Sequence, residues 1–423
     1  MRRIRIIDLR QRRTLKMINS HTSSKRQRLP VFPRRLLGIG VVFFAFLVFL
    51  HPFAQIQAAE PMPAGYTIPV VDISTDTNRQ VIVDRESGQY LGHPTTVLLE
   101  DGKTILIVYP KGHGRGAIVL KRSTDGGLTW SERLPVPENW ATSLETPTIH
   151  RVVDAQGKKR LIVWSGLYPA RLSVSEDDGK TWAPLTLAGD WGGIVVMGSV
   201  ERLRGQPGHY LALFHDDGRF FTKSPNVAKP PVMTLYQTES HDGGLTWDRP
   251  CSLFSSGEVH LCEPGLIRSP DGKQLAVLLR ENLRRRNSHA IFSNDEGRTW
   301  TTPRELPAAL TGDRHVGKYA PDGRLFISFR DTTRVSPTKG DWVGWVGMYD
   351  DIVAGHEGQC RVRIMHNTKA ADCAYPGVEV LPDGTFVATT YGHWTQGEPP
   401  YIVSVRFTLT ELDAKLKSGV PSP

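Results

Sequence analysis

Cysteine, long apolar runs and helical periodicity are all scarce in this sequence. Only 4 of its 423 residues are cysteine, and no Cys-x-x-Cys pair suggests a zinc site. The longest apolar run covers residues 36–50, which is short of the roughly 20 residues that a membrane-spanning helix needs. No helical pattern is longer than residues 410–417. We therefore expect one all-β domain after the N-terminal segment.

A basic surplus is also missing from most of the chain, although its net charge is +9. The first 35 residues hold 12 Lys and Arg residues and one acidic residue, Asp8. The remainder has 40 basic and 42 acidic residues, a net charge of −2. The high isoelectric point is thus a property of the N-terminal segment, and we expect no nucleic-acid partner for the folded part.

The N-terminal segment has the pattern of a secretory signal. A basic stretch ends at Arg35, the apolar residues 36–50 follow, and small residues occur about eight positions later. We expect cleavage near Ala58 or Ala59, so that residues 1–59 are a leader and signal peptide and the mature protein is secreted or periplasmic. The alternative is an uncleaved N-terminal anchor, which would be the only membrane contact.

Neither disulfide bonds nor a metal site can be assigned from the sequence. If the protein is exported, the four cysteines allow three disulfide connectivities, and buried free thiols are the alternative. A ring of histidines could hold a metal ion, but nothing fixes the spacing of such ligands. We predict no metal and no cofactor. The candidate residues are Cys251, Cys262, Cys360 and Cys373 for disulfides, and His93, His215 and His393 for a metal.

One eight-residue phrase, Ser-x-Asp-x-Gly-x-Thr-Trp, occurs four times, and its copies begin 52, 65 and 53 residues apart. A period near 50 residues indicates an array of one repeated supersecondary unit. Ser and Asp can close a turn by bonding backbone N–H groups, Gly supplies a positive φ, and Trp can anchor the turn between sheets. The predicted structural residues are Asp125, Trp130, Asp177, Trp182, Asp242, Trp247, Asp295 and Trp300.

A second, weaker repeat predicts the number of units. Six times, a β-rich run meets a glycine turn and continues as a second β-rich run, which is typical of a hairpin. Four strands per unit and six units predict a six-bladed β-propeller over residues 60–423. Residues 79–83 precede the first unit, and we expect them to supply the outer strand of the last blade, which removes a sheet edge. The turn glycines are Gly102, Gly157, Gly208, Gly272, Gly323 and Gly384.

The eight-residue phrase resembles the Asp-box, or BNR repeat, of the sialidase (neuraminidase) superfamily. The resemblance covers nearly the whole chain after the leader and implies the sialidase fold and an exo-α-sialidase-like activity. That family holds a substrate carboxylate with three arginines, attacks with a tyrosine whose proton passes to a glutamate, and uses an aspartate as acid/base. A neutral phenol is not repelled by the carboxylate of the sugar, but its pKa of about 10 requires a neighbouring base.

Four residues match this machinery, two at the starts of predicted inner strands and two at the ends of predicted second strands, all at the funnel face. The motif Cys-Ala-Tyr-Pro-Gly is similar to the last-blade segment of the family and places Tyr375 as the nucleophile. The motif Cys-Glu-Pro opens the fourth blade and places Glu263 as the base. Arg280 and Arg330 match two of the three arginines, and a guanidinium suits a bidentate grip on a carboxylate.

Two elements of the family pattern are missing from the first blade. Where the family has Arg-Ile-Pro, this chain has Gly-His-Pro with His93 in the middle, and the loop that should hold the acid/base aspartate reads Lys111-Gly-His113-Gly-Arg115. We expect Arg115 or Lys111 to contact the substrate anion and His113 to transfer the proton, since a histidine with a pKa near 6.5 exchanges protons at working pH. The other predicted substrate contacts are His93, Arg314, Asp331 and His393.

Charged residues near these candidates have simpler expected roles. We expect Asp313 to be a turn residue and Arg284, in a run of three arginines, to lie on a solvated loop or rim. Both residue types are common in such places, and neither carries a motif.

Three function classes fit these observations. The first is an exported glycoside hydrolase of sialidase type, exo-acting and retaining, which removes a terminal acidic sugar other than an ordinary sialoside from a glycan. The second is a carbohydrate-active propeller with different chemistry, such as a polysaccharide lyase or a glycosidase for uronates or rhamnosides, which the missing aspartate and the histidine-rich funnel favour. The third is a catalytically silent sugar-binding propeller. We expect the first.

Overall fold

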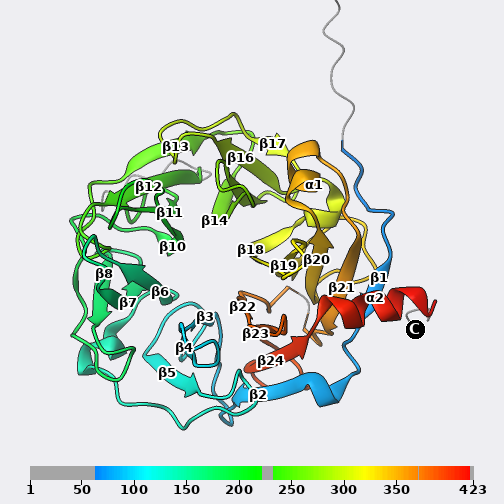
Figure 1. The fold of residues 1–423 in the computed structure, drawn as a ribbon, viewed down its shortest axis with the longest axis horizontal. Coiled ribbons are helices and arrows are strands. Elements are labelled where there is room, and N and C mark those ends of the chain that lie inside the picture. The colour runs from blue at the N-terminus through cyan, green and yellow to red at the C-terminus, as the bar shows by residue number, and fades with distance from the viewer. Residues whose placement is uncertain (1–61, 222–231, 370, 420–423) are drawn as a thin grey trace, which may run out of the picture. The chain divides into compact units, whose positions relative to one another are not determined.

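Six β-sheets stand radially around one axis in the part of the chain that the structure describes (Figure 1). This computed structural model describes residues 62–221, 232–369 and 371–419. The predicted six-bladed β-propeller is confirmed, whereas the predicted leader and signal peptide lie outside the described residues. Within those three ranges no helix is long and apolar enough to cross a membrane.

Each sheet is one blade, and its strands follow one another outward from the axis (Figure 1). The first blade contains β3 (Thr95–Leu98), β4 (Ile105–Pro110) and β5 (Ile118–Ser123). The second contains β6 (Thr148–Val153), β7 (Lys159–Ser165), β8 (Arg171–Ser175) and β9 (Thr186–Leu187). The third contains β10 (Ile194–Arg202), β11 (Tyr210–Asp216), β12 (Thr234–Ser240) and β13 (Cys251–Ser255).

The second half of the ring is built in the same way. The fourth blade contains β14 (Leu261–Arg268), β15 (Leu275–Glu281), β16 (His289–Ser293) and β17 (Arg304–Glu305). The fifth contains β18 (Gly312–Tyr319), β19 (Leu325–Asp331), β20 (Trp342–Gly347), β21 (Cys360–Met365) and β1 (Val70–Asp72). The sixth contains β22 (Gly377–Val380), β23 (Phe386–Gly392), β24 (Tyr401–Phe407) and β2 (Gln80–Asp84). The described helices are α1 (Tyr349–Ala354), α2 (Leu409–Lys417), η1 (Thr77–Arg79), η2 (Glu138–Thr142) and η3 (Ala308–Leu310).

The ring is closed by a strand from the start of the described chain. β2 pairs antiparallel with β24, with Val81 opposite Ser404, which confirms the predicted origin of the last blade's outer strand. β1 adds a parallel strand to the fifth blade. The prediction of four strands per blade is wrong for the first blade, which has three. There the segment after β5 makes only isolated bonds, from the N–H groups of Ser131 and Leu134 to β5 carbonyls.

The four eight-residue phrases, which we call the octapeptide turns (residues 123–130, 175–182, 240–247 and 293–300), share one set of hydrogen bonds. In each turn the serine Oγ accepts from the glycine N–H at 2.8–2.9 Å. The same hydroxyl donates to the aspartate Oδ1 at 2.8–2.9 Å. The threonine N–H donates to that Oδ1 at 2.9–3.0 Å. The structural role predicted for the phrase is therefore present in its local bonds.

Each octapeptide turn also packs against the preceding blade. A Cβ placed at the glycine that all four turns share would lie 2.4–3.0 Å from a side chain of that blade. The neighbours are Val387 for Gly127, Leu106 for Gly179, Val152 for Gly244 and Leu211 for Gly297. A larger residue would separate the blades, so the glycine is required by contact as well as by its positive φ.

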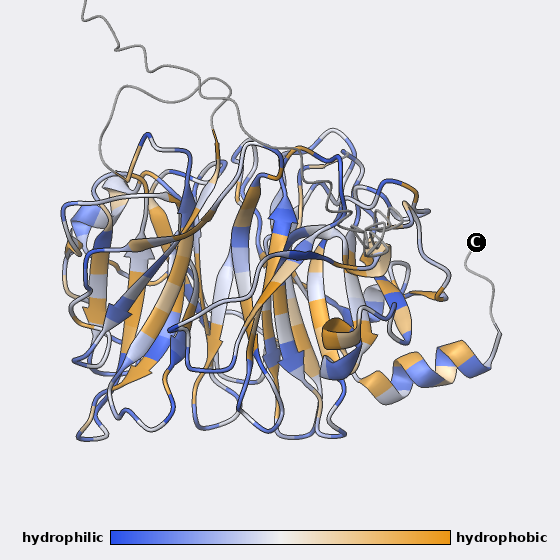
Figure 2. Ribbon diagram, turned by 90° about the horizontal axis from the view of Figure 1, so that it is seen from above, coloured by the Kyte–Doolittle hydropathy of each residue, from blue (hydrophilic) through white to orange (hydrophobic). Residues whose placement is uncertain are grey.

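The hydrophobic core lies between blades. Each large cluster of buried apolar residues draws on two neighbouring sheets, as when Phe326 of β19 meets Phe386 of β23 with ring centroids 5.2 Å apart. Trp247 of the third octapeptide turn packs on Trp164 of the second blade at 5.3 Å. Figure 2 shows the apolar residues concentrated along the strands. Burial between sheets is what holds the ring together.

All four cysteines lie within the described ranges and are free thiols, so none of the three disulfide connectivities is present. Cys251 is exposed and the other three are buried. Burial raises the pKa of Cys360 to about 12, which keeps its thiol protonated and unreactive at neutral pH.

Candidate functional site

The inner strands begin at the axis with an uncommon backbone conformation. His93, Met197, Glu263, Arg314 and Ala374 stand at the starts of five blades, and all are non-glycine residues with φ between 53° and 57°. The register of β10, β14 and β18 shifts at these points, as in a β-bulge. Bulges redirect side chains, and three of these residues line cavities on the axis: His93, Glu263 and Arg314.

One of these cavities, the axial pocket, has a volume of about 260 Å³. It brings together residues from the first four blades and the last. Its acidic, basic and phenolic groups line one concave space, which is the arrangement that proton transfer and nucleophilic attack require. The lining residues are His93, His113, Gly114, Glu145, Thr146, Ile194, His215, Met233, Cys262, Glu263, Arg280, Asn282 and Tyr375.

Tyr375 and Glu263 form the predicted hydrogen-bonded pair, although 112 residues separate them in the sequence. The Tyr375 hydroxyl donates to Glu263 Oε1. Arg280 Nη1 donates to the same carboxylate oxygen at 2.6 Å and to the Tyr375 hydroxyl oxygen at 3.3 Å. One guanidinium thus bridges the phenol and its acceptor, where it can stabilise a negative charge on either.

The pKa values of Tyr375 and Glu263 are shifted in opposite directions, which makes Tyr375 the proton donor and Glu263 the proton acceptor. Burial, followed by the charge of Glu263, raises the pKa of Tyr375 well above its usual value. Burial would also raise the pKa of Glu263, but the charge of Arg280, the hydrogen bond from Tyr375 and the nearby His215 together hold that pKa below its ordinary value. The phenol is therefore protonated and needs a base, and the carboxylate beside it is ionised and can serve as one.

Two buried histidines support the pocket as neutral hydrogen-bond acceptors. Burial lowers the pKa of His215 to about 4, and its Nδ1 accepts from the Glu263 backbone N–H at 3.3 Å. Burial lowers the pKa of His93 well below its usual value, and its Nδ1 accepts from the Gly114 N–H at 3.2 Å. Both bonds hold strained or glycine-rich backbone in place beside the pocket.

The two arginines predicted to hold a substrate carboxylate, Arg280 and Arg330, both contact the carboxylate of Asp313. Arg330 Nε donates to Asp313 Oδ2 at 2.9 Å, Arg284 Nη2 donates to the same oxygen at 2.8 Å, and Arg280 Nε lies 3.2 Å from Oδ1. The Asp313 side chain is 0% exposed. This corrects two expectations, since Asp313 is the centre of an ionic cluster rather than a turn residue and Arg284 is part of it. Arg330 faces this cluster, and only Arg280 lines the axial pocket.

His113 lies at the mouth of the axial pocket and is tied to residues that sequence reasoning missed. Its Nδ1 is 2.7 Å from the Tyr90 hydroxyl and 3.6 Å from Asp372 Oδ1. Tyr90 donates to Asp372 Oδ1 at 2.7 Å, and His393 Nε2 lies 2.9 Å from Asp372 Oδ2. Burial would raise the pKa of Asp372, but bonds from His113, Tyr90 and His393 hold it well below its usual value. His393 thus lies behind Asp372 and does not line the pocket.

The other predicted contacts are spread over different surroundings. Arg314 lines a neighbouring axial cavity of about 310 Å³, and its Nη1 has no hydrogen-bond partner among the described residues. Arg115 and Lys111 line an outer hollow of about 690 Å³ that shares His113 with the axial pocket. Asp331 is placed elsewhere: it pairs with the buried Arg361 at 3.0 Å, so it is part of the framework of the fifth blade.

Glu145 is the ionisable residue of the axial pocket that the sequence-based candidates left out. It precedes β6, at the funnel end of the second blade, and contributes a carboxyl group to the axial pocket. Its position at the start of an inner strand was the available signal. No family motif accompanied it, and position alone did not separate it from the other strand starts.

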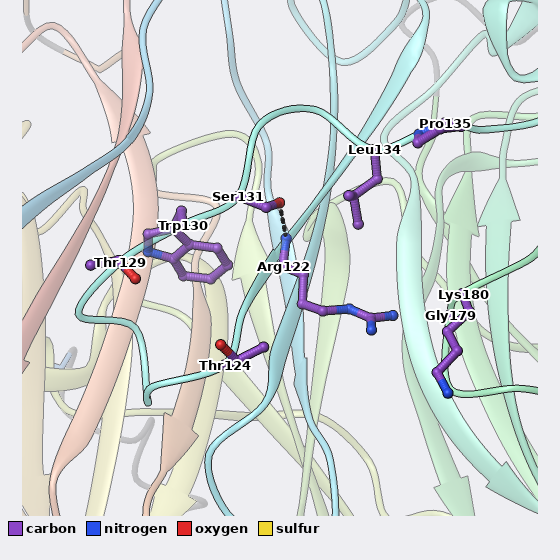
Figure 3. A pocket seen from close by; sticks show the side chains of 9 residues that line it. All are labelled: Arg122, Thr124, Thr129, Trp130, Ser131, Leu134, Pro135, Gly179 and Lys180. Carbon is purple, nitrogen blue, oxygen red and sulfur yellow. Dashed lines mark hydrogen bonds between the residues drawn. The ribbon is translucent and has the colours of Figure 1, made fainter.

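A larger hollow on the outside of the ring has different chemistry (Figure 3). It has a volume of about 480 Å³ and lies beside the first octapeptide turn, between Trp130 and Lys180. Its lining includes Arg122, whose backbone N–H donates to the Ser131 hydroxyl at 3.0 Å. No histidine, tyrosine or carboxylate is among the described residues that line it. The axial pocket, which holds all three kinds of group, is therefore the candidate active site.

Comparisons with known proteins find likeness in solved structures only. No protein-family model and no curated protein matches the chain. A protein of unknown function from Dyadobacter fermentans is similar with a TM-score of 0.60 and 15% identity, over 78% of this chain and 97% of that one. Penicillium chrysogenum α-L-arabinanase, complexed with arabinobiose, has a TM-score of 0.56 and 14% identity, over 79% and 98%. A leech intramolecular trans-sialidase, complexed with 2,7-anhydro-Neu5Ac, has a TM-score of 0.55 and 14% identity, over 77% and 69%. At such identities the likeness shows a shared propeller fold, one on which glycoside hydrolases are found.

Proposed function

We propose that this protein is an exported glycoside hydrolase that removes a terminal acidic sugar from a glycan with retention of configuration. The observation that carries the proposal is the hydrogen-bonded unit of Tyr375, Glu263 and Arg280 in a concave pocket on the propeller axis. A nucleophile, its base and a cation that stabilises the developing charge are the parts that covalent catalysis needs.

In the first half-reaction the Tyr375 oxygen attacks the anomeric carbon while its proton passes to Glu263. Arg280 donates to both oxygens, so negative charge is stabilised as it moves from carboxylate to phenol oxygen. The glycosidic bond breaks, the leaving oxygen takes a proton from an acid group of the site, and the sugar is joined to Tyr375. In the second half-reaction water gives a proton back to that group and displaces the phenol oxygen, which recovers its own proton from Glu263. Two displacements restore the original configuration.

The size and charge of the site support a single acidic sugar as the substrate. The pocket volume of about 260 Å³ is at or below the lower end of the range for drug-sized ligands, roughly 300–1,000 Å³, which favours a terminal unit. Four guanidiniums, those of Arg280, Arg284, Arg314 and Arg330, surround the two carboxylates of Glu263 and Asp313. This surplus of positive charge favours a ligand that carries a carboxylate.

A neutral terminal sugar is the second candidate substrate, and the position of Asp313 favours it. The Asp313 carboxylate already contacts the guanidiniums of three arginines. Fewer guanidinium N–H groups are therefore left to bind the carboxylate of a substrate. The likeness to an arabinanase whose structure holds arabinobiose is compatible with this alternative. The reaction class and the roles of Tyr375 and Glu263 would be unchanged.

A screen of the purified protein tests the proposal. The panel would contain sialosides, other ketosides and uronides, and neutral arabinosides, each offered as an oligosaccharide. Release of free sugar from an acidic member supports the proposal, and release from neutral members alone moves the substrate to the second candidate. An unsaturated product absorbing in the ultraviolet would identify a lyase, and saturable binding without turnover would identify a sugar-binding protein. Either of the last two outcomes overturns the proposal.

A further inference from the structure

We propose that Glu145 is the acid/base residue of this site, the group that protonates the departing oxygen and then activates water. This inference rests on the proposed hydrolase function. The geometry that carries it is the position of the Glu145 carboxyl in the wall of the axial pocket that also holds Tyr375 and Glu263. The role was expected of His113, so the inference assigns it to a different residue.

The Glu145 carboxyl is held from one side. Its Oε1 accepts from the Thr146 N–H at 2.9 Å and from the Thr146 hydroxyl at 3.1 Å. The loop of the first blade covers the same oxygen closely, since a Cβ at Gly114 would lie 3.0 Å from it. Both bonds are to Oε1, which makes Oε2 the oxygen that can carry a proton toward a ligand.

The surroundings of the two pocket carboxyls shift their pKa values in opposite directions. Burial raises the pKa of Glu145, and the charge of Glu263 adds to this, while Thr146 and His113 act in the other direction. The pKa of Glu263 is lowered, because Arg280, Tyr375 and His215 together act against its burial. Two carboxyls with opposite shifts in one site can divide the roles of acid and base between them.

His113 is poorly arranged for the same task. Tyr90 gives its hydroxyl proton to Asp372, so the 2.7 Å contact between Tyr90 and His113 Nδ1 requires Nδ1–H to be the donor. In the neutral imidazole this leaves Nε2 without a proton. The side chain is also 68% exposed, so a proton on it exchanges freely with solvent. His113 is better suited to contact the sugar or its leaving group at the mouth.

The proton balance of the reaction closes with Glu145 in this role. As the Tyr375 oxygen bonds to the anomeric carbon and the glycosidic bond breaks, Glu145 gives its proton to the leaving oxygen. The resulting carboxylate then takes a proton from water as that water attacks the anomeric carbon and the bond to Tyr375 breaks. Glu263 returns its proton to Tyr375, so the net change is hydrolysis alone.

The test compares Glu145→Gln with the wild type on two probes that share one sugar, a 4-methylumbelliferyl glycoside and an oligosaccharide. The sugar is the one released in the screen. We expect turnover of the oligosaccharide to fall at least about 100-fold, because an alcohol leaves poorly without a proton. The aryl probe should still give a burst of methylumbelliferone, since that group leaves without help, and added azide should restore turnover by replacing water in the second step.

Controls separate this inference from the proposed function. Glu138→Gln changes an exposed carboxyl of η2 and should match the wild type on both probes. Tyr375→Phe should abolish turnover of both, and its failure to do so would overturn the proposed function.

If instead Glu145→Gln stays within about threefold of the wild type on the oligosaccharide, or His113→Gln alone gives the burst and the azide rescue, Glu145 is not the acid. Should Glu145→Gln fold poorly, Glu145→Asp takes its place. We expect this variant to have reduced turnover but to keep the alkaline limb of the pH–rate profile. Loss of that limb would contradict the assignment.

Discussion

The octapeptide turns and the strand starts at the axis both recur around the ring. In the turns it is the residue types that recur, whereas at the strand starts it is only the backbone conformation. The four turns share five of their eight residues and the same serine, aspartate and threonine hydrogen bonds, and the serine–glycine distances agree within about 0.1 Å. The five strand starts keep the same positive φ but carry histidine, methionine, glutamate, arginine and alanine. At the turns the side chains make the structure, so they are constrained. At the axis the strands hold the backbone, so the side chains are free to differ and to supply chemistry.

The largest expected effect is at the axis, where removing one oxygen should stop the reaction without unfolding the protein. Tyr375→Phe removes the proposed nucleophile, and we expect turnover to fall by at least about 1,000-fold. The free energy of unfolding should change by only about 1–3 kcal/mol, since the hydrogen bond to Glu263 and the one from Arg280 are lost. Steady-state kinetics and urea unfolding measure the two. Residual turnover above a few per cent would remove Tyr375 from the mechanism.

The ionic cluster behind the axis should be next in size, and its effect should be on stability. Asp313→Asn leaves Arg280, Arg284 and Arg330 without their shared carboxylate, and breaking a buried pair costs about 3–5 kcal/mol. The arginines hold the pKa of Asp313 below its ordinary value, although burial opposes this. Its stabilisation is therefore complete above the unfolded-state pKa of about 3.9 and is lost as the pH falls below it. Urea unfolding at pH 7 and at pH 3 should show a large difference between variant and wild type that shrinks in acid; a difference that does not change with pH contradicts this account.

A smaller and repeatable effect is expected at the octapeptide turns. Asp125→Ala removes the acceptor for the N–H groups of Leu128 and Thr129 and for the Thr129 hydroxyl. We expect a loss of about 1–3 kcal/mol in the free energy of unfolding and unchanged turnover. The aspartates of the other turns, substituted one at a time, should give similar losses in thermal and urea unfolding. If one of these aspartate substitutions reduced turnover tenfold, the octapeptide turns could not be purely structural, and this prediction would be wrong.

The smallest effect should come from the group that positions His113. Asp372→Asn keeps the shape of the side chain but removes the charge that accepts from Tyr90 and contacts His113 and His393. We expect KM to rise about threefold to tenfold with little change in kcat, because His113 contacts the substrate at the mouth in this scheme. The pH–rate profile should keep its shape. A fall in kcat as large as that of Glu145→Gln would place the Asp372 and His113 pair in the proton transfer itself.

The pair of Tyr375 and Glu263 could be predicted, whereas its surroundings could not. Two short motifs at strand starts, and the resemblance that they carry, were enough to identify the pair. Asp313 and Asp372 had no motif, and their roles come from contacts across blades, such as the bond from Tyr90, 282 residues away in sequence. Glu145 stands at the start of a predicted inner strand, but its proposed role depends on its place in the wall of the axial pocket. A single sequence does not reveal which of several acidic residues near an axis is buried.

The sequence by itself determined the fold, because the signals for it are local. Each octapeptide turn is closed by bonds between residues two to four positions apart, and the glycine hairpins repeat at a regular period, so both can be recognised without knowledge of any contact between blades. Only the tertiary structure decided which charges neutralise one another. Asp313 contacts three arginines and Glu145 lines the axial pocket because six sheets converge on one axis. The protonation states that follow depend on burial and on partners brought from distant blades, which no local pattern contains.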